Sequence, residues 1–365
     1  MGVAAVGEWA VCFALLIVTL SVRFAFALPA VALLVGCGAK LAPKQARFEL
    51  GPCEPSFAID VETAGWGARP EPVIERGPAG SWDSTDALNP TVVRRGGVYY
   101  NLYSGYDGAV WRTGLAISND GVVWEKDAAS PVIEPDGEGW EGSYIAANGS
   151  LLETGGDLAY WYQAGPRGAT RIGLARSTDG RSWSKHPEPV LEPGPLGGWD
   201  DTAVGDPYVV RCRDFVAMFY LGQNRFSVQR LGVAISTDGV HWRKSHRNPL
   251  LEPGGEGSFD QRGLGEPAVF SSGGKLWMLY VGRDAAERRR IGWASSSTGV
   301  DWEKAPERGF LDGPAGWAEA VMCDPSVGVI EGRPAIWFGG GSQPSPDENL
   351  DGAVGVGTLE ASGNE

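Results

Sequence analysis

The sequence predicts an all-β fold, a five-bladed β-propeller built from four-stranded antiparallel blades. Tryptophans recur at steps of 59, 59 and 60 residues in "GVVWEK", "GRSWSK", "GVHWRK" and "GVDWEK". A second series steps by 58, 59, 60 and 58 residues, and its members are Trp82, Trp140, Trp199, Phe259 and Trp317. Between these markers, short β-branched and aromatic runs alternate with Gly, Pro, Asp and Asn, which is typical of strands joined by hairpins. Such four-stranded units, repeated around an axis, form a propeller.

The third repeat shows the four expected strands of a blade most clearly. Its apolar runs are "YVV" at 208–210, "FVAMFYLG" at 215–222, "LGVAIS" at 231–236 and "PLLEP" at 249–253. The last repeat lacks its fourth run, whereas residues 64–77 resemble a fourth strand with no first three before it. We therefore expect the N-terminal strand to complete the last blade and to close the ring, which also hides an open sheet edge.

The chain before the propeller predicts an exported lipoprotein. Residues 9–35 are almost continuously apolar, and they lead into "LLVGC", which looks like a bacterial lipobox with Cys37 as the lipidated residue. An uncleaved membrane-spanning helix is the alternative interpretation. We expect a signal segment at 1–37, a polar tether at 38–56 and a single propeller domain at 57–361. The expected location is the bacterial cell envelope, with a lipid anchor in the outer membrane.

Charge and cysteine usage exclude several functions. The formal net charge of -14 is unsuited to tracking nucleic-acid phosphates, so no nucleic-acid partner is expected. Three cysteines remain outside the leader at irregular spacing, and this predicts neither a disulfide framework nor a zinc site: Cys53, Cys212 and Cys323. The three histidines are too few and too scattered for a His-based metal centre. We expect a monomer without a cofactor. A Ca²⁺ ion on the propeller axis stays an open possibility, because carboxylates and loop carbonyls suit a hard cation.

Acid-proline steps recur in three consecutive repeats, in "VGDPYVV", "LGEPAVF" and "MCDPSVG". They place Asp206, Glu266 and Asp324 at the starts of inner strands. The same position holds Asn89 in the first repeat and residues 147–148 in the second. One interpretation is local, since proline tolerates the start of a strand and favours an extended residue before it. The other is functional, because inner strands line the axis and these residues then meet in one central funnel.

A cluster of carboxyl groups suits the cleavage of glycosidic bonds. That reaction needs one carboxylic acid that is still protonated near neutral pH and a second group that is ionised. Crowded acids satisfy both needs, because like charges raise one pKa while another stays low. We take Glu266, Asp206 and Asp324 as the candidate catalytic residues. Further residues expected on the same face are candidates for substrate binding: Asn89, Asp86, Tyr144, Asp201, Arg262, Arg283 and Glu319.

The repeats, the acid-proline steps, the "YYNLYSG" run and the "SxDGxxWxK" hairpins resemble the five-bladed propeller glycosidases. This group comprises glycoside hydrolase family 43 and the invertase and levansucrase relatives of family 32. The resemblance covers about Trp66 to Leu359 and implies hydrolysis of a poly- or oligosaccharide. Glu266 would be the general acid, with Asp206 and Asp324 sharing the base and pKa-tuning roles.

The positions of the acids depart from the family 43 pattern. There, a base Asp, a tuning Asp and an acid Glu come from the first three blades, whereas Asn89 occupies the first position here. A carbohydrate-binding propeller without catalysis and an envelope scaffold for protein contacts are the alternatives that stay open.

Overall fold

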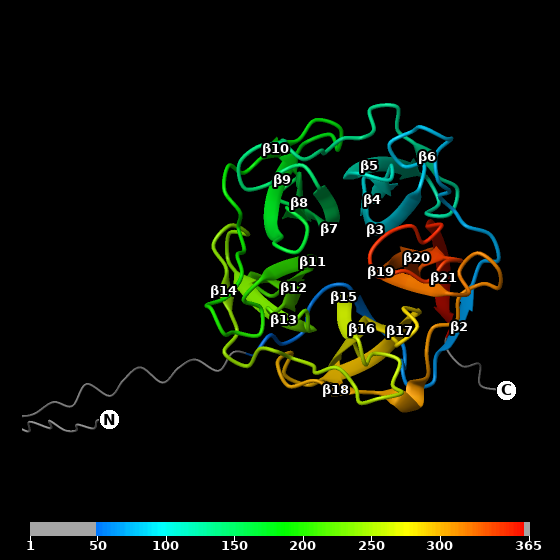
Figure 1. Ribbon diagram of the computed structural model, residues 1–365. Coiled ribbons are helices and arrows are strands. Elements are labelled where there is room, and N and C mark those ends of the chain that lie inside the picture. Colours follow the sequence, from blue (N-terminus) through cyan, green and yellow to red (C-terminus); the bar gives the residue numbers. More distant parts are fainter. Residues whose placement is uncertain (1–48, 361–365) are drawn as a thin grey trace, which may run out of the picture. The chain divides into compact units, whose positions relative to one another are not determined.

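Turns rich in Gly, Asp and Asn divide residues 49–360, the part of the chain that the computed structural model describes, into short strands joined by hairpins. Strand pairing groups them into five four-stranded antiparallel units around a central axis (Figure 1). We call these units blades 1 to 5 and their strands A to D, with A nearest the axis. The predicted all-β propeller is confirmed.

Each blade has long strands A, B and C and a short strand D. Blade 1 consists of β3 (Asp86–Arg95), β4 (Val98–Tyr106), β5 (Trp111–Ser118) and β6 (Glu125–Lys126). Blade 2 consists of β7 (Ile145–Thr154), β8 (Asp157–Gly165), β9 (Arg171–Ser177) and β10 (Ser184–Lys185). Blade 3 consists of β11 (Ala203–Cys212), β12 (Phe215–Gln223), β13 (Gln229–Ser236) and β14 (Arg243–Lys244).

The remaining two blades complete the ring. Blade 4 consists of β15 (Gly263–Ser272), β16 (Lys275–Arg283), β17 (Arg289–Ser296) and β18 (Glu303–Lys304), followed by the short 3₁₀ turn η1 (Pro306–Arg308). Blade 5 consists of β19 (Val321–Ile330), β20 (Arg333–Gly341), β21 (Ala353–Glu360) and β2 (Gly65–Ala68). Because β2 pairs antiparallel with β21, the predicted closure of the last blade by an N-terminal strand is confirmed.

Tryptophans of the C–D turns pack between blades, as the 59-residue repeat suggests. Trp242 meets Trp161 of blade 2 edge-on with ring centroids 6.1 Å apart, and Trp302 meets Phe219 of blade 3 at 5.8 Å. Each indole N–H also donates to the glycine carbonyl of its own turn. The repeated motif therefore serves the packing of one blade on the next.

Four blades also share an outer triad, a set of one carboxylate, one tyrosine and one lysine in contact. The carboxylate lies in the loop that enters the blade, the tyrosine on strand B and the lysine on strand D. The sets are Asp83, Tyr103 and Lys126; Glu141, Tyr162 and Lys185; Asp200, Tyr220 and Lys244; and Asp260, Tyr280 and Lys304. Blade 5 has Ala318, Phe338 and Ala68 at the corresponding positions. The same packing position is thus filled either by a polar set or by an apolar one.

The last residues of the predicted tether, 49–56, do not form a free tether. Leu50 and Cys53 are buried, and β1 (Ser56–Phe57) pairs in parallel with the end of β15. The expected boundary was wrong here because the segment contributes apolar side chains to the core that blades 3 and 4 share. Residues 1–48, with the predicted signal segment and Cys37, lie outside the described residues.

Cys53 and Cys212 form a disulfide that joins this segment to the end of β11, across a sequence separation of 159 residues. The sequence analysis predicted no disulfide framework, and the structure nevertheless contains this one disulfide among the described residues. Spacing along the chain carries no trace of the pairing, which depends on a tertiary approach: the N–H of Glu54 donates to the carbonyl of Arg211. Cys323 is a free, buried thiol.

Within residues 49–360, no helix has the length and apolar character needed to cross a membrane.

Candidate active site on the propeller axis

Each inner strand carries the same backbone irregularity at its axial end. A β-bulge interrupts the pairing of strands A and B in every blade, and the bulged residue has a φ between 43° and 50°. We call these five the slot residues: Asn89, Asn148, Asp206, Glu266 and Asp324. The expectation that proline holds its predecessor extended was wrong, because the pre-proline residues here adopt the left-handed region. Such strain in non-glycine residues is characteristic of functional sites.

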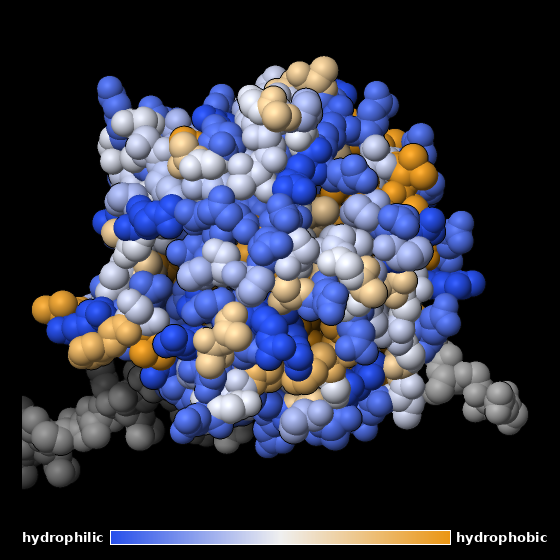
Figure 2. Space-filling view, turned by 45° about the vertical axis from the view of Figure 1, so that its right-hand side comes forward, coloured by the Kyte–Doolittle hydropathy of each residue, from blue (hydrophilic) through white to orange (hydrophobic). Residues whose placement is uncertain are grey.

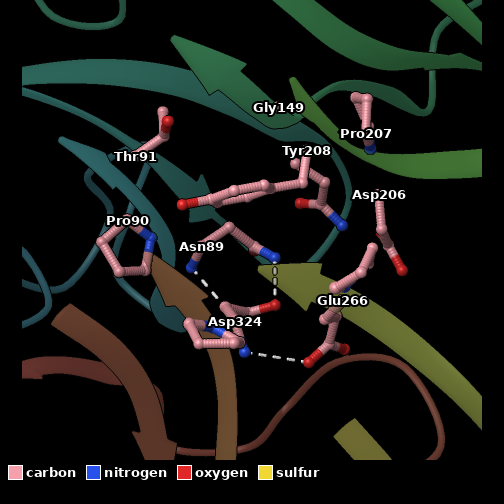
Figure 3. A pocket seen from close by; sticks show the side chains of 12 residues that line it. Asn89, Pro90, Thr91, Gly149, Asp206, Pro207, Tyr208, Glu266 and Asp324 are labelled. Atoms are coloured by element: carbon pink, nitrogen blue, oxygen red, sulfur yellow. Dashed lines mark hydrogen bonds between the residues drawn. The ribbon is translucent and has the colours of Figure 1, made fainter. Parts of the chain in front are cut away.

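At each bulge, the backbone N–H of the slot residue points toward the preceding blade. Asp324 donates to Oε2 of Glu266 at 2.9 Å, Asn89 donates to Oδ2 of Asp324 at 3.3 Å, and Glu266 donates to the Asp206 carboxylate. The N–H of Asn148 and the N–H of Asp206 donate instead to strand B side chains, Ser104 and Gln163. Figure 3 shows the links among Asn89, Asp324 and Glu266. The result is a ring of blade-to-blade hydrogen bonds around the axis.

The slot residues line one continuous cavity of about 380 Å³, here called the axial cavity. Its walls come from all five blades and carry several convergent polar side chains, as is typical of pockets that bind small ligands. Tyr208 lines a smaller pocket among the same slot residues. That tyrosine reaches across the axis, since its hydroxyl accepts a hydrogen bond from the N–H of Val327 in blade 5 at 3.3 Å.

Asp206 is one of two acids at the axis whose environment favours the protonated form. Burial and the nearby negative charge of Glu266 together raise the pKa of Asp206 to about 7, against the opposing effect of Arg289. Asn148 donates to the same carboxyl group, and its own Oδ1 is buried without a hydrogen-bond partner among the described residues. Asp206 therefore holds a proton close to neutral pH.

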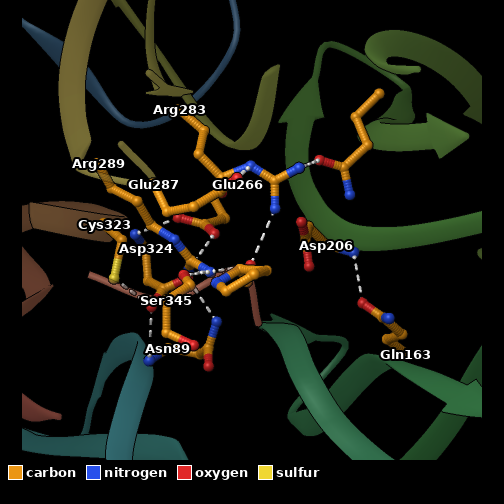
Figure 4. Close-up of polar contacts among 12 residues, drawn as sticks. Asn89, Gln163, Asp206, Glu266, Arg283, Glu287, Arg289, Cys323, Asp324 and Ser345 are labelled. Atoms are coloured by element: carbon orange, nitrogen blue, oxygen red, sulfur yellow. Dashed lines mark hydrogen bonds and ion pairs between the residues drawn. The ribbon is translucent and has the colours of Figure 1, made fainter. Parts of the chain in front are cut away.

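Glu266 has the opposite surroundings. Nη1 of Arg289 lies 3.3 Å from its Oε1, and the N–H of Asp324 donates to its Oε2. Both contacts are donors that suit a carboxylate rather than a carboxylic acid. Arg289 is itself almost fully buried, with 10% of its side chain exposed, and the charge of Glu266 helps to raise the pKa of that guanidinium. Figure 4 shows the pair beside Asp206.

Asp324 is the most enclosed of the three acids, at 7% exposure. Burial raises the pKa of Asp324 well above its ordinary value, and the charge of Glu266 acts in the same direction. The side chain and backbone of Asn89 both donate to its carboxyl group, as does the Cys323 thiol at 3.0 Å. Its contacts fix blade 5 to blade 1, so its first role is to hold the ring at the site.

The structure brings together six of the ten residues that the sequence singled out. The three acids line the axial cavity with Asn89, Tyr144 and Arg283. Tyr144 lies under the guanidinium of Arg167, 4.4 Å from its ring centre, and its hydroxyl is 3.4 Å from Glu348. The six residues together come from all five blades, so the cavity surrounds a ligand rather than facing it from one side.

Four predicted substrate-binding residues lie elsewhere. Asp86 is fully buried and accepts three backbone N–H groups of the loop at 349–352, and Asp201 binds Gly197 and Arg225. Asp86, at the start of β3, and Asp201 each hold a loop in place, a role that the residue type alone cannot reveal. Arg262 and Glu319 are exposed outside the cavity lining.

The loop between strands B and C of blade 5, residues 342–352, supplies wall residues that were not among the candidates chosen from the sequence. Glu348 binds Arg167 of blade 2 through both carboxylate oxygens and lies 3.3 Å from the hydroxyl of Tyr106 of blade 1. The carbonyl of Pro346 accepts from Arg283 at 2.9 Å and from Arg289 at 2.6 Å. Arg289 is the middle residue of the run "RRR" at 288–290. Because side chains alternate sides along a strand, Arg289 points to the opposite side from its two neighbours, and this alternation is the signal that could have singled it out.

The residues at the axis do not fit a Ca²⁺ ion. Among the described residues, Glu266, Cys323 and Asp324 bring ligand atoms within 4.8 Å of one another. Calcium takes six to eight oxygen ligands, whereas this group contains a thiol and lies against the Arg289 guanidinium. Both oxygens of Asp324 already accept hydrogen bonds. We derive no step through a metal here.

Comparison with solved structures identifies the class of fold. A protein described as a glycoside hydrolase superposes with a TM-score of 0.64 at 16% identity, over 82% of this chain and 94% of that one. Zg3597, a family 117 glycoside hydrolase of the marine bacterium Zobellia galactanivorans, gives 0.60 at 17% identity, over 82% and 92%. A thermostable family-43 glycoside hydrolase gives 0.57 at 17% identity, over 78% and 91%. The chain therefore has the propeller fold of these glycoside hydrolases.

Sequence comparison adds one relative. The uncharacterized protein Rv1502 of Mycobacterium tuberculosis is 27% identical over 224 residues, which covers 58% of this chain and 72% of that protein. No protein-family model matches the chain.

Proposed function

We propose that this chain hydrolyses glycosidic bonds in the axial cavity. The observation that carries the proposal is the contrast between two carboxyl groups of one cavity. Asp206 has a pKa raised to about 7 by burial, whereas Glu266 is held by a guanidinium and a backbone N–H. Glycosidic cleavage needs that division between a proton donor and a carboxylate. The fold shared with glycoside hydrolases agrees with it.

The roles within this mechanism differ from those that the family resemblance implies. Asp206 donates its proton to the leaving glycosidic oxygen as the C–O bond breaks. Glu266, as the carboxylate, either takes a proton from the attacking water or attacks the anomeric carbon itself. Asp324 positions Glu266 through its own backbone N–H. Surroundings decide these roles more strongly than the length of the side chain, because proton affinity follows burial and charge.

A second candidate function is carbohydrate binding without turnover. Each of the three carboxyl groups accepts a hydrogen bond from a backbone N–H of the next blade. Those bonds give the acids a structural reason to be present, even where no chemistry takes place. Neutral donors and acceptors in the cavity walls, such as Gln163 and Gln229, would still bind sugar hydroxyls.

Hydrolysis assays separate the two functions. The purified protein is incubated with a panel of aryl glycosides and polysaccharides, and released sugar is measured for wild type, Asp206→Asn and Glu266→Gln. We expect both variants to lose at least about a hundredfold in kcat. Glu319→Gln removes an exposed carboxylate outside the cavity and serves as the matched control. Binding without turnover in every form favours the second candidate, and neither binding nor turnover across the panel would instead favour an envelope scaffold.

We propose further that the protein is exported and lipidated at Cys37. The disulfide between Cys53 and Cys212 supports export, because such bonds persist in oxidising compartments. Metabolic labelling with a fatty-acid analogue tests the lipidation. Label is expected in the wild type and not in Cys37→Ser, and an unlabelled wild type that is nevertheless found in the envelope would contradict it.

A further inference from the structure

Two arginines approach each other in the wall of the axial cavity above Glu266. Arg283 is the last residue of β16 and Arg289 the first of β17, so the short loop between them brings both side chains to the same end of blade 4. Both donate to a single acceptor, the carbonyl oxygen of Pro346. Figure 4 shows the two guanidinium groups side by side above the acids.

Carboxylates lie directly beside only some nitrogens of this pair, and the charge of Asp347 in the cavity wall acts on both guanidiniums from a longer range. Glu287 lies beside Nε of Arg283 at 3.2 Å, and Glu266 lies beside Nη1 of Arg289. The remaining nitrogens of the two guanidinium groups donate to neutral oxygens. Nη1 of Arg283 and Nη2 of Arg289 donate to the Pro346 carbonyl, and Nη2 of Arg283 donates to Oε1 of Gln229 at 3.2 Å. A guanidinium has five N–H donors, and these bonds engage only part of them.

We propose that this part of the axial cavity binds the carboxylate of an acidic sugar, held by Arg283 and Arg289 with Gln229 beside them. The inference rests on the proposed function and names its substrate class: glycosides that carry a uronic acid at the cleavage site. A planar carboxylate matches the fork of a guanidinium, and two guanidiniums at one point suit an anion better than a hydroxyl group. The site lies directly above Glu266, where the sugar ring must sit for cleavage.

Binding measurements with paired ligands test the proposal independently of turnover. Methyl glucuronide and methyl glucoside, and methyl galacturonide and methyl galactoside, differ only at the carboxylate carbon. Calorimetric titration of the Glu266→Gln variant, in which hydrolysis is blocked, should give at least one uronide a Kd roughly tenfold or more below that of its neutral partner. Equal affinity within both pairs would overturn the inference.

Arginine variants identify the site. Arg283→Gln is expected to raise the Kd of the uronide roughly tenfold to a hundredfold and to leave the neutral sugar within about twofold. Arg288→Gln is the matched control, because Arg288 adjoins Arg289 in sequence but pairs with Asp284 and is half-exposed outside the cavity. A parallel loss for both sugars in Arg283→Gln would mean that the arginine is only structural.

Two further outcomes separate this inference from the proposed function. Selective uronide binding without hydrolysis of any uronide substrate by the wild type would contradict the enzyme while supporting the subsite. Inorganic phosphate is titrated as the free-anion probe. If phosphate binds more tightly than every uronide, with the same dependence on Arg283, the site belongs to a free anion and the inference fails.

Discussion

The backbone N–H of Asp324 donates a 2.9 Å hydrogen bond to Oε2 of Glu266 and so joins blade 5 to blade 4 at the axis. Oε1 of Glu266 also accepts a hydrogen bond from Nη1 of Arg289. One side chain therefore satisfies two donors that have little access to water, and its proposed part in the chemistry is inseparable from its part in holding the ring together.

Substitutions of Glu266 should separate its role in the chemistry from its role in holding the blades together. Glu266→Gln keeps an oxygen acceptor, so we expect it to lower the free energy of unfolding by less than about 1 kcal/mol. Glu266→Ala leaves the Asp324 N–H and Nη1 of Arg289 without their acceptor and leaves the buried guanidinium without its carboxylate, so it should cost about 2–4 kcal/mol. Urea denaturation followed by tryptophan fluorescence measures both. Equal stability of the two variants would show that the blade-to-blade bond contributes nothing.

Asp206 should make the stability depend on pH in a defined window. Its pKa is raised from 3.8 to about 7, so between these values the native state holds a proton that the unfolded chain has released. This contribution is complete below pH 3.8 and disappears as the pH rises through 7. From pH 4 to pH 8, wild type should lose about 1–3 kcal/mol relative to Asp206→Asn, which does not titrate. Parallel stability curves for the two proteins would contradict the raised pKa.

The hydrolytic activity should also depend on the protonation of Asp206 and should fall as the pH rises. Because the proposed proton donor is the protonated Asp206, kcat/KM is expected to fall tenfold per pH unit above about 7. The measurement is a pH profile on a substrate with a poor leaving group. A profile that stays level from pH 6 to pH 9 would remove Asp206 from the role of general acid.

Reduction of the disulfide should loosen the N-terminal segment before it affects the cavity. The bond closes a loop of 159 residues, and its loss is expected to lower the free energy of unfolding by about 2–5 kcal/mol. Cys53→Ser with Cys212→Ser, compared with wild type in thermal melts with and without reductant, checks this. The melting temperature of the double variant should not change when reductant is added. A melting temperature that falls equally in both proteins would trace the effect to another group.

Blade 5 provides a template for substituting the outer triads. Removing only Asp200 leaves Lys244 without its buried partner and should cost about 3–5 kcal/mol. Replacing the whole set by the residues of blade 5, with Asp200→Ala, Tyr220→Phe and Lys244→Ala, should cost less than that single change, because no charge is left unpaired and Nδ2 of Asn248 keeps the Val233 carbonyl as acceptor. Chemical denaturation compares the three proteins. A triple variant that is less stable than Asp200→Ala would mean that the polar set stabilises blade 3 beyond its own pairing.

The repeats predicted the fold because each blade must bury the same faces, and tryptophan or phenylalanine at a fixed spacing records that need. They also predicted that Asp206, Glu266 and Asp324 meet, since equivalent strand positions in a closed ring share one axis. The left-handed bulge at these residues was not predictable from the acid-proline step, because proline alone favours the extended form.

Residues outside the acid-proline steps escaped prediction for a different reason. Asp86 and Asp201 bind backbone N–H groups, whereas Arg289 lines the cavity and Glu348 holds Arg167 at its wall. Nothing in their neighbours along the chain separates these cases, because the direction of each side chain depends on contacts with residues distant in sequence. The pairing of Cys53 with Cys212 depends on such a contact as well.

The N-terminal segment crosses the propeller at the ends of inner strands β11 and β15, far from the bulges that open the axial cavity at their beginnings. Residues 49–57 are consequently packed on the face opposite the mouth of the axial cavity, and none of them lines it. This segment therefore leaves the mouth open, so a long polymer can reach the acids without passing over it.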